Sequence, residues 1–193
     1  MKMTKTKTLL LIFFFYSLAW CTGLRAQQMV ACPLPVGSGT SYCWQACIYC
    51  DLDGLLDSNT VNTFVPISVC SGSIPLNNPR WYGFIAGSQI LALDIVPITN
   101  LKGTDGLQAA IVDLEDCNAD EAPGVYVACA PGAAGGAGQT ISLLATDLIP
   151  GHAYRLVVDG FNGGSSKYKI RVALGTTAPQ PLGPLNAING PKT

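Results

Sequence analysis

The chain has 193 residues, with 11 basic and 12 acidic side chains, and only 12% of its residues are charged. Ordinary globular proteins have about 25% charged residues, whereas this chain has 21 glycines and 13 prolines. This composition is typical of a turn-rich extracellular module. The near-neutral charge excludes the broad basic surface with which proteins bind nucleic acid or anionic membranes.

The first 26 residues predict an export signal. Three lysines in MKMTKTK precede the apolar run LLLIFFFYSLAW (Leu9 to Trp20), and Leu24-Arg25-Ala26 forms a cleavage site before Gln27. This order is typical of a secretory signal peptide, and about 12 apolar residues are too few to span a bilayer, which needs about 20. We therefore expect residues 1–26 to be removed and a 167-residue chain to be secreted or held at the cell surface. Its seven basic and twelve acidic residues give a net charge of −5.

Residues 27–60 form a Cys-rich N-terminal segment that contains CWQACIYC (Cys43 to Cys50). The C-x3-C-x2-C spacing matches the cluster-binding signature of radical S-adenosylmethionine enzymes, and closely spaced cysteines can also bind zinc. Exported proteins enter an oxidising environment in which paired thiols persist as disulfides, and where an oxygen-labile cluster is hard to keep. The sequence therefore favours disulfides over a zinc site, and a zinc site over an iron–sulfur cluster.

Seven cysteines follow the signal peptide. Cys117 and Cys129 flank an acidic loop between two expected strands, and we expect them to pair; a bridge over about 12 residues stabilises by roughly 3 kcal/mol in the loop-entropy account. The remaining five can form two bridges and leave one thiol free, and the sequence does not choose among the pairings. These five are Cys32, Cys43, Cys47, Cys50 and Cys70.

The stretch DLDGLLDSN places Asp51, Asp53 and Asp57 in one short segment. Several nearby carboxylates suit calcium, which prefers oxygen ligands. The EF-hand order is not met, because Gly54 comes two positions early and Asn62 stands where the bidentate Glu belongs. These carboxylates can be interpreted as a calcium site or as a solvated Asx-rich turn, and the sequence favours the turn.

Residues 61–175 are expected to form a β-sandwich domain. Short β-rich segments recur every 8 to 15 residues or so, several with an alternation of apolar and polar side chains, and Gly-, Pro- and Asn-rich turns separate them. About eight such strands predict an all-β, antiparallel sandwich, specifically a jelly roll. The segments are Thr63–Val69, Trp81–Ala86, Ile90–Val96, Leu107–Leu114, Val125–Cys129, Thr140–Ala145, Ala153–Asp159 and Tyr168–Leu174.

The sequence contains few groups suited to catalysis. The only histidine, His152, lies in a Pro-Gly turn, and no nucleophile elbow or metalloprotease helix accompanies it. We therefore expect no enzymatic activity. Trp44 in the cysteine loop and Phe161 in a Gly-rich turn are the aromatic residues that we expect to be exposed, and flat exposed rings can stack on sugars.

Three stretches carry a resemblance to a known family. LIPGHAYRLVVDGFNGGSSKYKIRV (Leu148 to Val172) resembles the last hairpin of the bacterial pre-peptidase C-terminal domain family, and RWYGFIAGSQILALDIVP (Arg80 to Pro97) and GLQAAIVDLEDC (Gly106 to Cys117) are similar to its earlier strands. The combination of YCDLDG (Tyr49 to Gly54), NNPRWYGFIAGS (Asn77 to Ser88) and GLQAAI (Gly106 to Ile111) also looks like the N-terminal module of large multidomain proteins that gliding bacteria export by type IX secretion. The resemblance implies a non-catalytic jelly roll.

The resemblance leaves two functions open. One is a binding or adhesion module for an extracellular glycan or protein ligand; the other is a structural spacer or accessory domain of a secreted hydrolase whose catalytic domain lies elsewhere in the parent chain. Residues 176–193 are rich in Pro and small residues, which suits an extended linker. We expect this linker to lead to a further domain of the same parent protein.

Overall fold

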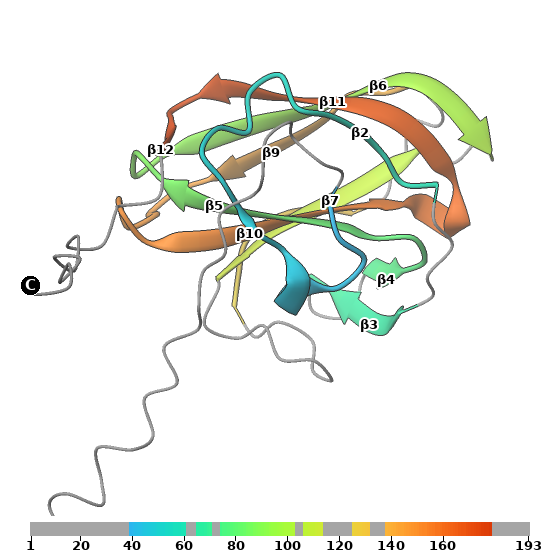
Figure 1. Cartoon of the computed structure of the whole chain (residues 1–193), viewed down its shortest axis with the longest axis horizontal. Helices are drawn as coiled ribbons and strands as arrows, with labels where there is room; N and C mark the ends of the chain where they lie inside the picture. The colour runs from blue at the N-terminus through green and yellow to red at the C-terminus, as the bar shows by residue number, and fades with distance from the viewer. Residues whose placement is uncertain are drawn as a thin grey trace, which may run out of the picture.

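Two β-sheets packed face to face form the body of the computed structural model (Figure 1). The structure describes residues 39–60, 65–70, 74–102, 106–113, 125–131 and 138–178. The predicted signal peptide, Cys32, Cys117 and residues 179–193 lie outside these ranges. Within them, no helix is long and apolar enough to cross a membrane.

The two sheets share no strand. The sheet named here the β5 sheet has the order β1-β5-β10-β7-β8, with β12 also paired to β5, and consists of β1 (Ile48–Tyr49), β5 (Arg80–Ala86), β10 (Ala153–Gly160), β7 (Leu107–Asp113), β8 (Tyr126–Ala130) and β12 (Thr177–Ala178). The β11 sheet has the order β2-β11-β6-β9 and consists of β2 (Leu56–Ser58), β11 (Ser165–Leu174), β6 (Leu91–Lys102) and β9 (Ile141–Ala145). A separate ribbon pairs β3 (Val65–Val69) with β4 (Ile74–Leu76). Short 3-10 turns occur at η2 (Cys43–Gln45) and η4 (Phe161–Gly163).

The all-β sandwich predicted from the alternation pattern is confirmed. Each of the eight expected segments overlaps a strand, namely β3 or one of β5 to β11. The described residues contain four further strands, β1, β2, β4 and β12, which are two or three residues long. Alternation cannot be read over so few residues, so these strands were not foreseen.

The core lies between the facing sides of the two sheets. Its largest fully buried side chains include Tyr82, Phe84 and Tyr168, and it is completed by aliphatic residues from both sheets. In the β11 sheet, buried positions alternate with exposed ones along β9 and the middle of β11, and with partly buried ones along the first half of β6. This is the pattern of an antiparallel sheet with one face on the core and one face toward water.

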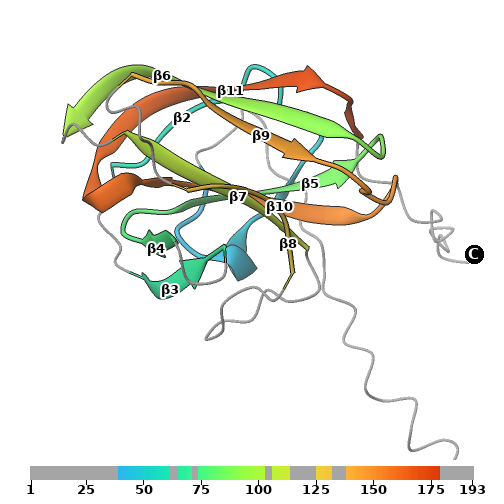
Figure 2. The same cartoon turned by 180° about the vertical axis from the view of Figure 1, so that it is seen from behind.

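The β5 sheet is buried on both faces along β5 and β10, in which every residue is buried, whereas its edge strand β8 is only partly buried. Its outer side forms a second apolar cluster that brings Cys43 and Ala46 of the η2 region and Leu76 of β4 against Trp81 and Val157. Figures 1 and 2 show η2, β3 and β4 on the side of the β5 sheet that faces away from the β11 sheet. The Cys-rich segment and the β3–β4 ribbon thus cover one outer face of the sandwich.

A buried polar cluster ties three turns together at one end of the sandwich. The Asn78 Nδ2 donates to the carbonyls of Asn59 (2.6 Å) and Gly164 (2.8 Å), and its Oδ1 accepts from the Gly160 N–H at 2.9 Å. Asn59 Oδ1 accepts from the Ser166 N–H at 2.7 Å. A Cβ at Gly160 would lie 1.5 Å from the Gly164 oxygen, so only glycine allows this approach.

Candidate binding face

The outer face of the β11 sheet presents apolar side chains to solvent. Leu56 on β2, Ile98 on β6 and Leu144 on β9 are 63%, 56% and 60% exposed. Single exposed aliphatic residues are normal on protein surfaces. Several on one sheet face that no described segment covers are less usual, and exposed apolar patches mark interaction sites.

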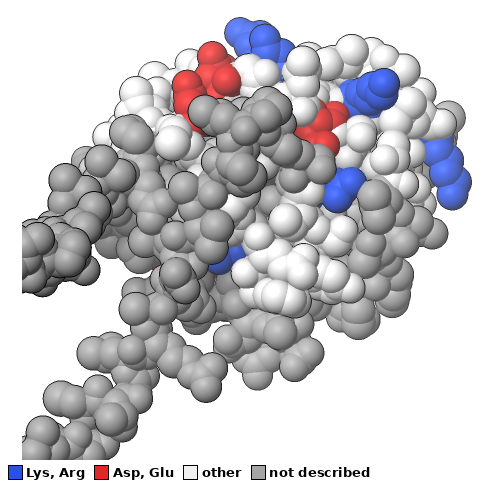
Figure 3. All heavy atoms as spheres, in the orientation of Figure 1, with Lys and Arg blue, Asp and Glu red and all other residues white. Residues whose placement is uncertain are grey.

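Basic side chains form a row on the central strand of this face. Lys167, Lys169 and Arg171 occupy alternate positions of β11 and are exposed, while Tyr168 and Ile170 between them are buried. Because successive side chains of a strand point to opposite faces, the three cations all point outward. Figure 3 shows Lys and Arg side chains along the margin of the molecule that β11 and β6 form, with carboxylates beside them.

Strand register identifies the neighbours of each cation. Lys167 lies between Ser58 of β2 and Thr99 of β6. Lys169 lies between Leu56 and Val96. No acidic residue is thus directly opposite either lysine.

Arg171 has an acidic neighbour. It pairs across the strands with Asp94, whose Oδ1 accepts a 2.7 Å hydrogen bond from the Ser142 hydroxyl. None of the three cations of the row forms an ion pair with a described residue. Arg171 therefore has a carboxylate directly opposite it, whereas the positive charges of Lys167 and Lys169 do not.

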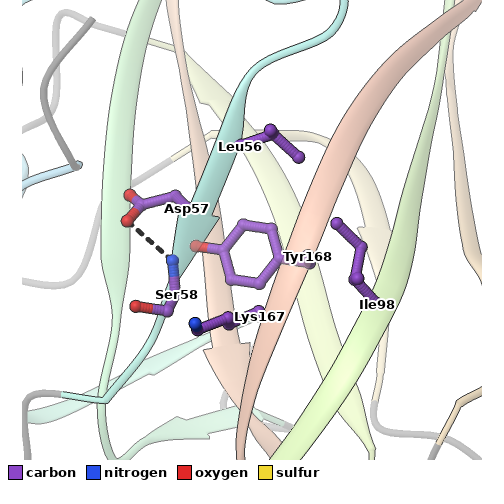
Figure 4. Close-up of a pocket in the computed structure, with 6 residues that line it drawn as sticks. All are labelled: Leu56, Asp57, Ser58, Ile98, Lys167 and Tyr168. Atoms are coloured by element: carbon purple, nitrogen blue, oxygen red, sulfur yellow. Dashed lines mark hydrogen bonds between the residues drawn. The ribbon is translucent and has the colours of Figure 1, made fainter.

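A shallow hollow opens beside Lys167, between β2, β11 and β6 (Figure 4). It has a volume of about 280 Å³. Its lining combines apolar, polar and charged groups from three strands: Leu56, Asp57, Ser58, Ile98, Lys167 and Tyr168. The carboxylate in this lining, Asp57, already accepts three hydrogen bonds from within the chain. With apolar walls and Lys167 at its rim, the hollow suits a ligand that is partly apolar and partly anionic.

A chain of hydrogen bonds lies beneath the hollow. The Tyr82 hydroxyl donates to Asp57 Oδ2 at 2.6 Å and lies 2.5 Å from the Tyr168 hydroxyl. The same Oδ2 accepts from the Gly39 N–H at 2.6 Å. Burial raises the pKa of both phenols well above the usual value, and the negative charge of Asp57 raises each further. Both tyrosines therefore stay neutral at physiological pH and fix β2 to the core.

The three carboxylates considered for calcium separate into two environments. Asp51 and Asp53 line a shallow pocket beside β12, where Asp51 Oδ1 accepts from the Asp53 N–H and Asp53 Oδ1 accepts from the Val172 N–H. Asp57 instead binds the buried Tyr82. In the described part of the chain, no group of three Asp, Glu, His or Cys side chains is placed to hold a metal ion.

The cysteines follow the predicted oxidation state but not the predicted pairing. Cys129 bonds to Cys70, so the expected Cys117–Cys129 bridge is wrong. Cys43 and Cys47 are also disulfide-bonded. Cys50 is an exposed free thiol, so one member of the CWQACIYC cluster is left unpaired. The bridge from Cys70 joins the end of β3 to β8, which fastens the covering ribbon to the β5 sheet.

The two candidate aromatic residues differ in exposure. Trp44 is 51% exposed and stacks on Tyr42, which is 40% exposed, with ring centroids 5.9 Å apart. Phe161, in η4, is only partly exposed. The η2 turn thus displays a pair of aromatic rings, on the covering segment rather than on the β11 sheet.

His152 contacts Asp113 and Tyr154. Its Nε2 lies 2.8 Å from Asp113 Oδ1, and its ring packs edge-on against Tyr154. This contact ties the turn before β10 to the end of β7.

Comparison with protein-family models, with curated proteins and with solved structures finds no match for this chain.

The row on β11 was not singled out from the sequence. The alternation of Lys167, Lys169 and Arg171 with Tyr168 and Ile170 is visible there and predicts a solvent face. What marks this face as a candidate site is that no described segment covers it, whereas η2 and β4 cover the β5 sheet. Which outer face is covered depends on where the Cys-rich segment packs, and the alternation of apolar and polar residues does not predict that.

Proposed function

We propose that this chain is a non-catalytic binding or adhesion module of a secreted or cell-surface multidomain protein, and that the outer face of the β11 sheet contacts its ligand. The observation that carries the proposal is the unequal covering of the sandwich. One outer face lies beneath disulfide-bonded segments, while the other presents Leu56, Ile98 and the three cations of β11 to solvent.

We also infer that the sandwich is a jelly roll. The order β2-β11-β6-β9 in one sheet and β5-β10-β7-β8 in the other supports this. With the β3–β4 ribbon left out, successive strands from β2 to β11 alternate between the two sheets, except that β7 and β8 are neighbours in the same sheet. The last of these strands, β11, pairs with β2, the first strand of its sheet. This is the interleaving produced by a folded double Greek key.

An extracellular location is supported by the oxidised cysteines. The Cys70–Cys129 bridge and the bonded state of Cys43 and Cys47 suit an oxidising compartment, since cytosolic thiols are kept reduced. A non-catalytic role is supported by the polar groups near the hollow. Asp57 accepts three hydrogen bonds from within the chain, and the hydroxyls of Tyr82 and Tyr168 are buried and hydrogen-bonded to each other.

The test is binding of the full chain, purified with its disulfides formed, to an array of extracellular glycans and matrix proteins. Ile98→Ser removes an exposed aliphatic side chain from the proposed face, and Val125→Ser removes one that is 53% exposed, just before β8 of the other sheet. We expect Ile98→Ser to weaken the positive signals and Val125→Ser to leave them unchanged. Silence across the whole array would contradict the proposal and favour the spacer or accessory role.

A further inference from the structure

We infer that the ligand of the β11 face is an acidic polysaccharide, held by Lys167, Lys169 and Arg171. This inference rests on the proposed binding function and adds the chemical class of the ligand. It begins from the distribution of charge. The described residues include six Lys and Arg, of which Arg80 and Arg155 are buried.

All four exposed cations of the described residues lie on two adjacent strands of one sheet. Three form the row on β11, and Lys102 lies at the end of β6, opposite Ser165 of β11. The chain as a whole has more acidic than basic residues. Among the described residues, the exposed positive charge thus gathers on the two central strands of the sheet whose outer face no described segment covers.

The spacing of the row suits a polymer with repeating charges. Alternate residues of a strand are about 7 Å apart, which is within the screening length of about 8 Å at physiological salt. Neighbouring cations therefore repel one another, and an anionic partner relieves this repulsion. The residues paired directly with Lys167 and Lys169 on β2 and β6 are neutral. Asp57 of β2 also lines the hollow beside Lys167, but its carboxylate accepts hydrogen bonds from Tyr82 and from two backbone N–H groups and forms no ion pair with a described lysine.

The backbone geometry favours a polysaccharide over an acidic peptide. Peptides that bind β-sheets usually add a strand to an open edge through main-chain hydrogen bonds. β11 is instead an inner strand: it pairs with both β2 and β6 at Lys167 to Lys169, and beyond β2 the Val172 N–H donates to Asp53. A ligand on this face must be recognised by side chains alone, through its charged groups.

The hollow beside Lys167 offers a surface on which a sugar ring can pack. Leu56 and Ile98 form its apolar walls, and Lys167 stands at its rim (Figure 4). The C–H surface of a sugar ring can pack on such walls while its hydroxyls stay in water. A carboxylate or sulfate on the same ring then reaches the lysine.

Two pairs of polymers test the inference, because each pair keeps the backbone and removes the charge. Polygalacturonate is compared with its fully methyl-esterified form, and dextran sulfate with dextran. We expect the full chain to bind at least one anionic polymer, at least tenfold more tightly than its neutral form, with affinity falling as salt is raised. Binding of only the first anion indicates carboxylate recognition, and of only the second sulfate recognition; either result supports the inference.

Matched variants locate the site. Lys169→Gln and Gln45→Glu each lower the net charge by one, the first in the row and the second on the exposed η2 turn. At low salt we expect Lys169→Gln to weaken binding roughly two- to fivefold, the range of one exposed ion pair. Removing all three cations of the row should weaken it at least tenfold, whereas Gln45→Glu should change it less than twofold. Circular dichroism checks that each variant is folded.

Three outcomes would overturn the inference. Equal weakening by Gln45→Glu would mean that only net charge matters, and equal or tighter binding of poly-glutamate would indicate an acidic protein ligand. Failure to bind either anionic polymer, with positive signals on the array, would refute the polysaccharide and leave the proposed function standing. If the chain also binds nothing on the array, both the polysaccharide inference and the proposed binding function are refuted.

Discussion

Replacing Asp159 with asparagine should remove a pH-dependent part of the stability of this chain. The Asp159 side chain is 1% exposed. Its Oδ1 accepts from the N–H groups of Asn77 (3.1 Å) and Asn78 (2.7 Å), and its Oδ2 from Gln108 Nε2 at 2.6 Å. Burial raises its pKa from 3.8 to about 6, because the loss of hydration outweighs these hydrogen bonds, which favour the charged form.

The sign of the effect follows from proton binding. Between about pH 4 and pH 6 the folded chain holds the Asp159 proton more tightly than the unfolded chain, so the free energy of unfolding falls as the pH rises through this window. The contribution is fully present below pH 4 and lost above pH 6. A shift from 3.8 to about 6 corresponds to about 3 kcal/mol.

Urea unfolding of the disulfide-bonded chain, followed by tryptophan fluorescence from about pH 3.5 to pH 7, measures this contribution. The stability of the parent chain minus that of Asp159→Asn should fall by about 3 kcal/mol across this range. Asp147→Asn, which changes an exposed turn residue, is the control for the loss of one carboxylate and should change stability by less than about 1 kcal/mol at each pH. A difference between the parent and Asp159→Asn that stays constant with pH would refute the reasoning.

Three further predictions follow from the contacts. Tyr168→Phe should lower the free energy of unfolding by about 1 kcal/mol, since it removes one buried hydrogen bond; a loss below the error of urea unfolding would contradict this. Replacing Cys70 and Cys129 by alanine opens a bridge across 59 residues and should cost about 4 kcal/mol, whereas Cys50→Ser should leave the thermal midpoint within about 1 °C; equal effects would argue against the pairing. Trp44→Ala should leave the affinity for an anionic polymer unchanged, because Trp44 lies on the covering segment, and a tenfold loss would move the ligand to the η2 turn.

The sequence predicted the layers of the fold better than their edges. The apolar–polar alternation of β6 and β11 was sufficient to predict strands with one face on the core. The continuous apolar stretch of β5 was harder to interpret, because it reflects burial on both faces. That double burial arises from η2 and β4, which are distant in sequence from most of the strands they cover.

The disulfide pairing could not be predicted for a related reason. Cys117 is much closer to Cys129 in sequence than Cys70 is, and a short loop is the simpler expectation. Cys70 instead follows β3 and has a positive φ of 54°, and it lies against the outer side of the β5 sheet. Its partner is set by tertiary packing of the β3–β4 ribbon, about which cysteine spacing carries no information.

Only some features of the candidate site could likewise be predicted from the sequence. Exposure of Trp44 and the outward direction of Lys167 and Lys169 follow from local sequence. The separation of Asp57 from Asp51 and Asp53 does not, since it depends on a buried hydroxyl of Tyr82, 25 residues away along the chain. Local spacing therefore predicted which side chains are polar and near each other in sequence, but not which of them the core would engage.

The free side of β5 is closed by short pieces from both ends of the described chain. Thr40 bridges to Trp81, β1 pairs with Gly83 and Phe84, and β12 pairs with Ile85 and Ala86. Exposed strand edges invite pairing with another chain. Proteolytic removal of β12 would uncover the backbone donors and acceptors at one end of β5, so the loss of a two-residue strand would leave a sandwich prone to edge-to-edge aggregation.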